Sequence, residues 1–208
     1  MRLPALKFEE LTPRQRELHA RIAGKRGQVR GPFLVWLHSA ELCDRVEALG
    51  AYVRYDCSLS EKLREFSILI TARFWDAQHS WNAHVDKAIA AGMSAEALSA
   101  IAEHRTPEFT ERDERIFYTF SMEVLEQHFV SDETFAAALT EFGPQGVVDI
   151  IGCLGNFSML AMCLNTFQVD LDPNRAPPYP DIRGFARVVE SAPHAAHGWP
   201  ARDSPVRR

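Results

Sequence analysis

The chain has 208 residues, a hydrophobic content of 46% and a formal net charge of −5. This length suffices for one domain with a substantial core, and the lack of a basic surplus argues against nucleic acid or an anionic membrane surface as a partner. No uninterrupted apolar run approaches the roughly 20 residues that cross a bilayer, and the start MRLPALKFEE lacks the apolar stretch of a signal peptide. We therefore expect a cytoplasmic protein with no membrane partner.

Apolar spacing predicts an all-α fold. Apolar residues recur at intervals of three and four from about residue 11 to about residue 168, whereas alternating β-branched runs are almost absent. Thr12 and Pro13 predict the start of the first helix, because threonine caps a helix and proline suits its first turn. The glycines from Gly24 to Gly31 predict the loop that follows it.

Caps and breakers predict the remaining helices. The apolar stripe from Phe33 to about Tyr55 indicates one continuous helix. Ser60 predicts the start of the next, and Asp76 the start of its continuation to about Ala91. Later helices are predicted from Ser94, from Thr110 to about His128, from Ser131, and from the Gly143–Pro144 break to about Phe167. The total is seven or eight helices.

The last predicted helix, VVDIIGCLGNFSMLAMCLNTF, is apolar nearly all round. Such a helix lies at the centre of a fold or in a subunit interface, and Gly152 and Gly155 would let another helix approach closely. After Asp172 the composition changes to proline, arginine and histidine, which can hardly form a core. We therefore expect a helical domain over 1–171 and an arm or partly disordered tail over 172–208.

Ionisable and aromatic residues are densest in LREFSILITARFWDAQHSWNAHVDKAIAAGMS. In a continuous helix Ala77, Ser80 and His84 share a face, because they lie three and four residues apart. His79 is about 140° away from His84 at 100° per residue. The two histidines converge if His79 lies in the first turn, or if a neighbouring helix or subunit closes around them.

This segment resembles the helical hairpin of carboxymuconolactone decarboxylases and alkylhydroperoxidase D-like proteins. GPFLVWLHSAELCDRVEALGAYVRY, LSEKLREFSILI and the closing apolar helix extend the resemblance over most of residues 31–170. It implies a helical bundle of seven to eight helices with an irregular proline-rich tail. It also implies trimers or hexamers, a small-molecule substrate and no cofactor.

The peroxidase branch of that family has a glutamate, eleven residues, a cysteine, two residues, a second cysteine, three residues and a histidine. Here the same frame reads Glu65, Ala77, Ser80 and His84. Without sulfur at those positions there is no thiolate to attack a peroxide and none to resolve it, so we expect no thiol peroxidase activity. The four cysteines that are present lie far apart or at helical spacing, with no C-x-x-C, and are predicted to be buried: Cys43, Cys57, Cys153 and Cys163.

Decarboxylase-type members keep a histidine pair without the cysteines, and His79 matches the histidine that many members place before the second cysteine position. A glutamate common at the position of Ser80 in such members is missing here. The resemblance implies an enzyme acting on lactones or related unsaturated acids from aromatic-compound breakdown. In it His84, supported by Glu65, would transfer a proton and His79 would stabilise an oxyanion. The residues expected to bind or enclose the substrate are Trp36, His38, Arg73, Ser80, Trp81 and Asn156.

Other interpretations stay open at this point. His84 and His79 are also typical of core histidines, and Trp36 and Trp81 of core aromatics. A metal held by Glu65, His79 and His84 is disfavoured, because ligand pairs on a helix lie three or four residues apart and these histidines lie five apart. A redox protein and a non-catalytic helical oligomer that binds an aromatic ligand are the competing functional classes.

Overall fold

The computed structural model describes residues 1–180, which contain eight α-helices and no strand. The prediction of an all-α fold is confirmed. The helices are α1 (Pro13–Arg26), α2 (Phe33–Trp36), α3 (Ala40–Ala51), α4 (Glu61–Phe74), α5 (Gln78–Ala90), α6 (Ala95–Ala102), α7 (Arg112–Met122) and α8 (Asp132–Phe167). A 3₁₀ turn, η1 (Phe8–Glu10), precedes α1, and the π-helical turns η2 (Tyr52–Asp56) and η3 (Glu123–Gln127) extend α3 and α7.

Four helices begin at the capping residues that the sequence indicated. Thr12 forms a capping box with Gln15 at the start of α1. The side chains of Ser60, Ser94 and Ser131 each accept a hydrogen bond from a backbone N–H in the first turn of α4, α6 and α8. Each cap satisfies a backbone donor that has no partner inside the helix. The starts of these four helices could therefore be predicted from neighbouring residues.

The prediction of one continuous helix from Phe33 to Tyr55 is wrong. The chain leaves α2 after Trp36, and Ser39 adopts φ −123° and ψ 82°, outside the helical region. The side-chain amide of Gln15 on α1 donates a 2.8 Å hydrogen bond to the carbonyl of Leu37 at this break. A tertiary contact therefore supplies a partner for backbone that a continuous helix would have satisfied internally.

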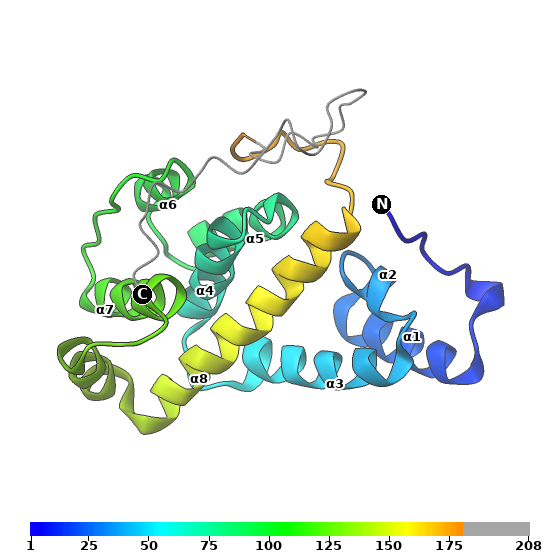
Figure 1. Cartoon of the computed structure of the whole chain (residues 1–208), viewed down its shortest axis with the longest axis horizontal. Coiled ribbons are helices and arrows are strands. Elements are labelled where there is room, and N and C mark those ends of the chain that lie inside the picture. Colours follow the sequence, from blue (N-terminus) through cyan, green and yellow to red (C-terminus); the bar gives the residue numbers. More distant parts are fainter. Residues whose placement is uncertain (181–208) are drawn as a thin grey trace.

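The predicted break at Gly143–Pro144 is a kink inside α8. Gly143 has φ 67° and ψ 175°, which only glycine adopts without strain, and Pro144 lacks the backbone N–H that an uninterrupted helix would use. The helix continues on both sides of this point. The carboxy-terminal part of α8 then runs through the middle of the molecule (Figure 1).

Two apolar clusters lie on either side of α8. The larger cluster joins α4, α5, α7 and α8 around Phe66, Phe117 and Ile150. The smaller one joins α1, α2 and α3 around Ile22 and Trp36, with Cys163 of α8 completing it. α8 is the one helix of the described residues that is long and apolar enough to cross a membrane, but 56% of its most apolar window is buried inside the fold. That burial is typical of a core helix.

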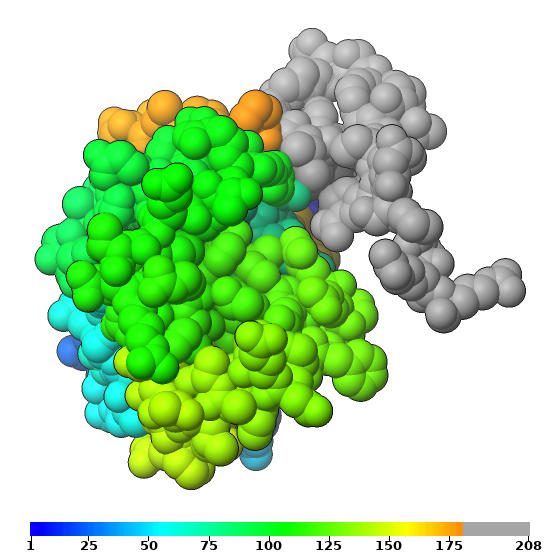
Figure 2. Space-filling view, turned by 90° about the vertical axis from the view of Figure 1, so that its left-hand side faces the viewer, coloured from blue at the N-terminus to red at the C-terminus, as the bar shows by residue number. Residues whose placement is uncertain are grey.

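The described start of the predicted arm packs against the hairpin of α4 and α5. Tyr179 is 6% exposed, and its hydroxyl donates a 3.3 Å hydrogen bond to the carbonyl of Ala72. Asn82 donates a 3.0 Å bond to the carbonyl of Ala176. This segment crosses the top of the molecule in both views (Figure 1 and Figure 2). The rest of the predicted tail, 181–208, lies outside the described residues.

Candidate functional site

A glutamate and a histidine from the two helices of the hairpin form a buried pair. Glu65 lies on α4 and His84 on α5, and the turn between these helices places Asp76 at φ 53°. The Nδ1 atom of His84 lies 2.5 Å from Oε2 of Glu65, with the side chains 13% and 8% exposed. Because the carboxylate can only accept, Nδ1 carries the proton and Nε2 presents its lone pair. No described residue hydrogen-bonds to Nε2.

The surroundings set the charge states of this pair. Burial lowers the pKa of His84 below its ordinary value of 6.5, although the hydrogen bond to Glu65 opposes the shift. For Glu65, burial alone would raise the pKa, but the bond to His84 and the charges of His84 and Arg54 outweigh it and hold the pKa below its ordinary value. At neutral pH the pair is therefore a neutral imidazole held by a carboxylate.

His84 borders a cavity of about 190 Å³, here called the basic cavity. α5 contributes one wall, α8 and the Gly31–Phe33 turn contribute others, and η2 closes the side next to Glu65. Its lining residues are Arg26, Gln28, Arg30, Gly31, Pro32, Phe33, Arg54, Tyr55, His79, Ser80, Ala83, His84, Lys87, Leu160 and Leu164. Four of these carry a positive charge and none is acidic, so the cavity suits an anionic ligand.

The structure brings His79 to the same cavity. His79 is the second residue of α5, so it lies in the first turn, the condition under which the two histidines were expected to converge. Its Nδ1 bonds at 2.9 Å to the carbonyl of Asp170, and burial lowers its pKa. A side chain on Gly31 would approach Nε2 of His79 to 3.1 Å, so glycine at this position leaves room for the imidazole.

The two positions that hold cysteine in the peroxidase frame flank this site. Ala77 is completely buried at the N-cap of α5, and Ser80 is buried along the basic cavity. All four cysteines of the chain are buried elsewhere. Burial raises the pKa of Cys43 and of Cys163 to about 11, so both remain thiols at neutral pH.

Arg73 and Trp81 lie outside the basic cavity. The guanidinium of Arg73 pairs with Asp76, donates a 2.9 Å bond to the carbonyl of Ala102, and lies 4.3 Å from the centre of the Tyr179 ring. Trp81 is 3% exposed and packs edge-on against the same ring. Both side chains anchor the segment that follows α8, and Arg73 has no access to a ligand beside His84.

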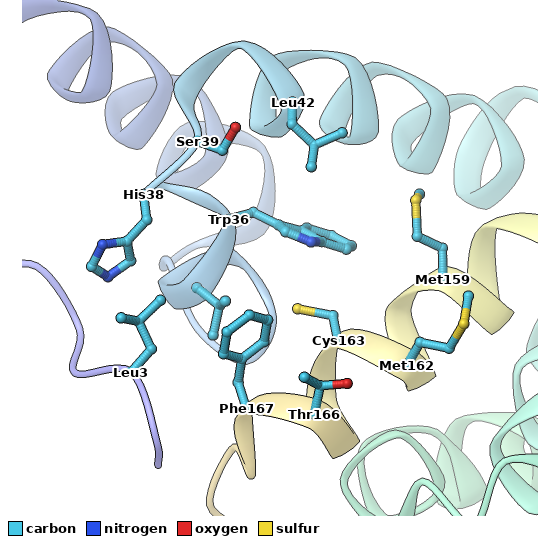
Figure 3. A pocket seen from close by; sticks show the side chains of 11 residues that line it. Leu3, Trp36, His38, Ser39, Leu42, Met159, Met162, Cys163, Thr166 and Phe167 are labelled. Atoms are coloured by element: carbon cyan, nitrogen blue, oxygen red, sulfur yellow. The ribbon is translucent and has the colours of Figure 1, made fainter.

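Trp36 and His38 line a different cavity, of about 400 Å³, here called the apolar cavity. Figure 3 shows Trp36 between Leu42 of α3 and Cys163 of α8, with His38 at the edge. His38 is exposed and its Nε2 lies 2.9 Å from the carbonyl of Pro4. The break after α2 directs these two side chains away from His84, so they do not join the site that the sequence assigned to them.

Asn156 lies in the middle of α8 and is 2% exposed. Neither polar atom of its side chain has a hydrogen-bond partner among residues 1–180. Sequence reasoning missed its neighbour Arg26, together with Arg30, Arg54 and Lys87 of the basic cavity. The sequence could have predicted that Lys87 lies near His84, because it comes three residues later on the same helical face. The arginines come from separate segments, and no local pattern links them.

A metal centre finds no support in the described part of the chain, where no three histidine, cysteine, aspartate or glutamate side chains are grouped. His84 and Glu65 bond to each other, and His79 bonds to a backbone carbonyl.

Comparison with known proteins identifies the fold. No family model matches the sequence, and the search of curated proteins gives no significant match. A peroxidase-related protein with an alkylhydroperoxidase AhpD core from Ralstonia eutropha JMP134 superposes with a TM-score of 0.69 at 18% identity, over 83% of this chain and 92% of that one. A peroxidase-related protein from Silicibacter sp. TM1040 gives 0.67 at 12% identity, over 83% and 91%.

A third solved structure is a cysteine-to-alanine variant of the debrominase Bmp8 in complex with 2,3,4-tribromopyrrole. It superposes with a TM-score of 0.65 at 12% identity, over 83% of this chain and 92% of that one. At such identities the likeness shows fold and not activity. The chain therefore has the all-α fold of the alkylhydroperoxidase AhpD core.

Proposed function

We propose that this chain is a cofactor-independent proton-transfer enzyme acting on an unsaturated lactone or a related acid. The observation that carries the proposal is the 2.5 Å contact between His84 and Glu65 beside a basic cavity. A neutral imidazole whose Nδ1–H is fixed by a carboxylate presents Nε2 as a base of moderate strength. The cofactor-free chemistry and the lactone class come from the resemblance to carboxymuconolactone decarboxylases.

The geometry supports a simple sequence of events. Nε2 of His84 removes a proton from carbon next to the lactone carbonyl, and the electron pair moves into a dienolate whose oxygen carries the charge. The imidazolium, stabilised by Glu65, returns the proton to another carbon of the conjugated system. His79 and the positive charges of the cavity stabilise the oxyanion.

Decarboxylation uses the same groups in another order. The bond to the carboxyl carbon breaks, carbon dioxide leaves, and its electron pair forms the same dienolate. A proton from solvent, carried by His84, then completes the product. The two reactions differ in the form of His84 that must be present at the start, which makes the pH dependence of the rate diagnostic.

Redox chemistry is the weaker alternative, because the cysteine positions of the frame hold Ala77 and Ser80 and no cysteine of the chain lines the basic cavity. The bromopyrrole bound to the Bmp8 variant supports a small planar ring as the kind of ligand that this fold encloses. The debromination named for that protein is not proposed for this chain, since no thiol lines the basic cavity.

The test is a screen of the purified chain against unsaturated lactones and their carboxylated derivatives, followed by ultraviolet absorbance and by carbon dioxide release. We expect turnover of at least one compound and a loss of about 10²- to 10⁴-fold in His84→Gln. Circular dichroism of the variant should match the parent, because glutamine can donate to Glu65. Full activity of His84→Gln, or ligand binding without turnover by the parent, would reject the enzymatic role.

We also propose that copies of the chain associate through one face of α8, with the trimer or hexamer implied by the resemblance. Val148, Ile151 and Met162 are 70%, 47% and 43% exposed and follow each other along this helix. A side chain added at Gly155 would meet no atom within 4 Å, so this position leaves space for a neighbouring backbone. An exposed apolar stripe of this kind is typical of a self-association surface.

A further inference from the structure

The guanidinium of Arg26 lines the basic cavity and forms no ion pair with a carboxylate of the described residues. Arg26 ends α1, its Nε is buried, and no described residue forms a hydrogen bond or an ion pair with its side chain. Its Cζ lies 4.7 Å from the centre of the Phe33 ring. Burial, reinforced by the charge of Arg54, lowers the pKa of Arg26, and the opposing effects of Tyr55 and Glu47 do not cancel this shift.

Three other basic residues of α1 provide the contrast. Arg14 and Arg21 pair with carboxylates of α1 and α3, and Lys25 lies 3.8 Å from Glu47. Arg26 is the next residue after Lys25, yet it turns toward the cavity instead of toward these acids. Its position is therefore not explained by the ion pairs that join α1 to α3.

A second unpartnered group lies beside Arg26. An ideal Cβ on Gly50 of α3 would lie 3.5 Å from Nη2 of Arg26 and 3.8 Å from Oδ1 of Asn156, so both groups reach one point above Gly50. Asn156 is 2% exposed with neither polar atom bonded. The unpaired buried donors, Nε of Arg26 and Nδ2 of Asn156, are unfavourable unless a ligand supplies acceptors.

The charge of the basic cavity favours an anionic ligand. Arg26, Arg30, Arg54 and Lys87 line it, and the carboxylate of Glu65, which is bonded to His84, lies 3.9 Å from Arg54. The four basic residues that line the cavity therefore face no acidic lining residue, and Glu65 forms an ion pair with one of them. A planar guanidinium matches a carboxylate with two parallel hydrogen bonds, and the Asn156 amide can donate a third.

We propose that Arg26, which lines the basic cavity, binds a carboxylate of the substrate while the substrate ring faces His84, and that Asn156, buried near Arg26 behind the cavity wall, completes this carboxylate-binding subsite. This inference rests on the proposed function only in taking His84 as the group that reacts with the substrate. The carboxylate that binds here is held in place and is not the group that leaves. The subsite therefore selects acids over neutral lactones of the same shape.

Binding can be measured without turnover, using benzoate as the probe and benzamide as its neutral counterpart. In calorimetric titration of the full chain, benzoate should bind and benzamide should bind at least about tenfold more weakly. Benzoate should also raise the melting temperature of the parent protein. Arg26→Gln should lose both the binding and the rise, and Asn156→Leu should weaken both.

Two control variants separate a binding role from a structural one. Lys25→Gln and Arg21→Gln remove neighbouring positive charges outside the cavity, and both should keep the benzoate-induced rise even where the starting melting temperature falls. Benzoate binding that is unchanged in Arg26→Gln, the absence of binding to the parent, or preference for inorganic phosphate would overturn the carboxylate assignment. Normal benzoate binding by a parent that turns over no lactone would sink the proposed function and leave the subsite standing.

Discussion

The basic cavity and the apolar cavity share one helix but differ in chemistry. Leu160 and Leu164 of α8 line the first, whereas Met159, Met162 and Cys163 line the second. α8 itself offers apolar side chains on both sides, so it does not set the difference. The difference comes from the elements opposite α8. α5, η2 and the end of α1 supply histidines and cations to the basic cavity, whereas α2 and α3 supply Trp36 and Leu42 to the apolar cavity.

This contrast separates catalysis from stability. The basic cavity contains groups whose burial costs free energy and which a ligand would compensate. The side chains that line the apolar cavity stabilise the contact between α2, α3 and α8, because packing removes their apolar surface from water. Substitutions in the first should therefore change turnover and binding, and substitutions in the second should change the free energy of unfolding.

The largest effect on stability is expected for Trp36→Ala. Trp36 is 6% exposed and belongs to the smaller apolar cluster, so its truncation should lower the free energy of unfolding by about 3 kcal/mol. Denaturant titration measures this loss. Turnover by the folded fraction should stay close to that of the parent, and a selective loss of turnover at unchanged stability would show that the apolar cavity belongs to the active site.

The pH profile sharpens the role of His84. Because the pKa of His84 is lowered, the neutral base predominates at neutral pH, and kcat/KM should rise about tenfold per pH unit below that pKa and then reach a plateau. Since the unfolded chain takes up this proton near pH 6.5 and the native one resists it, folding stability from this residue should fall as the pH drops through and below that value.

Glu65→Gln tests the partner in the same assay. The carboxylate raises the pKa of His84 against the effect of burial, so its removal should move the rising limb to lower pH and reduce the plateau by at least about tenfold. The matched stability measurement is chemical denaturation at pH 8. A rate that instead falls with increasing pH would make imidazolium the reactive form and favour decarboxylation over proton abstraction.

A smaller effect is expected at the face of α8 that is proposed to carry self-association. Val148→Asp places a charge on a side chain that is 70% exposed, so it should reduce the oligomer mass measured by light scattering with little change in the secondary structure of the subunit. Glu141→Gln, at an exposed position on the same helix, serves as the control. An unchanged mass in Val148→Asp would remove this face from the interface.

The smallest effect is expected for His38→Ala. His38 is exposed and makes one hydrogen bond, to the carbonyl of Pro4, so its loss should cost about 0.5 kcal/mol or less. Activity should be unchanged, in contrast to His84→Gln. A large loss of turnover in His38→Ala would break the division between the two cavities.

Local signals were sufficient for most helix starts. The caps at Thr12, Ser60, Ser94 and Ser131 act within one turn, so the residues that form them are neighbours in the sequence. The break after Trp36 escaped detection because it is stabilised by Gln15, which lies on another helix. The periodic apolar stripe continues across that break, so it predicts an uninterrupted helix.

The sequence by itself determined the all-α class, the absence of sulfur from the peroxidase frame, and a glutamate and a histidine at the spacing that a helical hairpin joins. Only the tertiary structure decided which other side chains accompany that pair. It excluded Arg73, Trp36 and His38 from the basic cavity and brought Arg26 into it. The reason is physical: caps and periodicity act within a few residues, whereas a cavity depends on how distant helices pack, which no short stretch of sequence encodes.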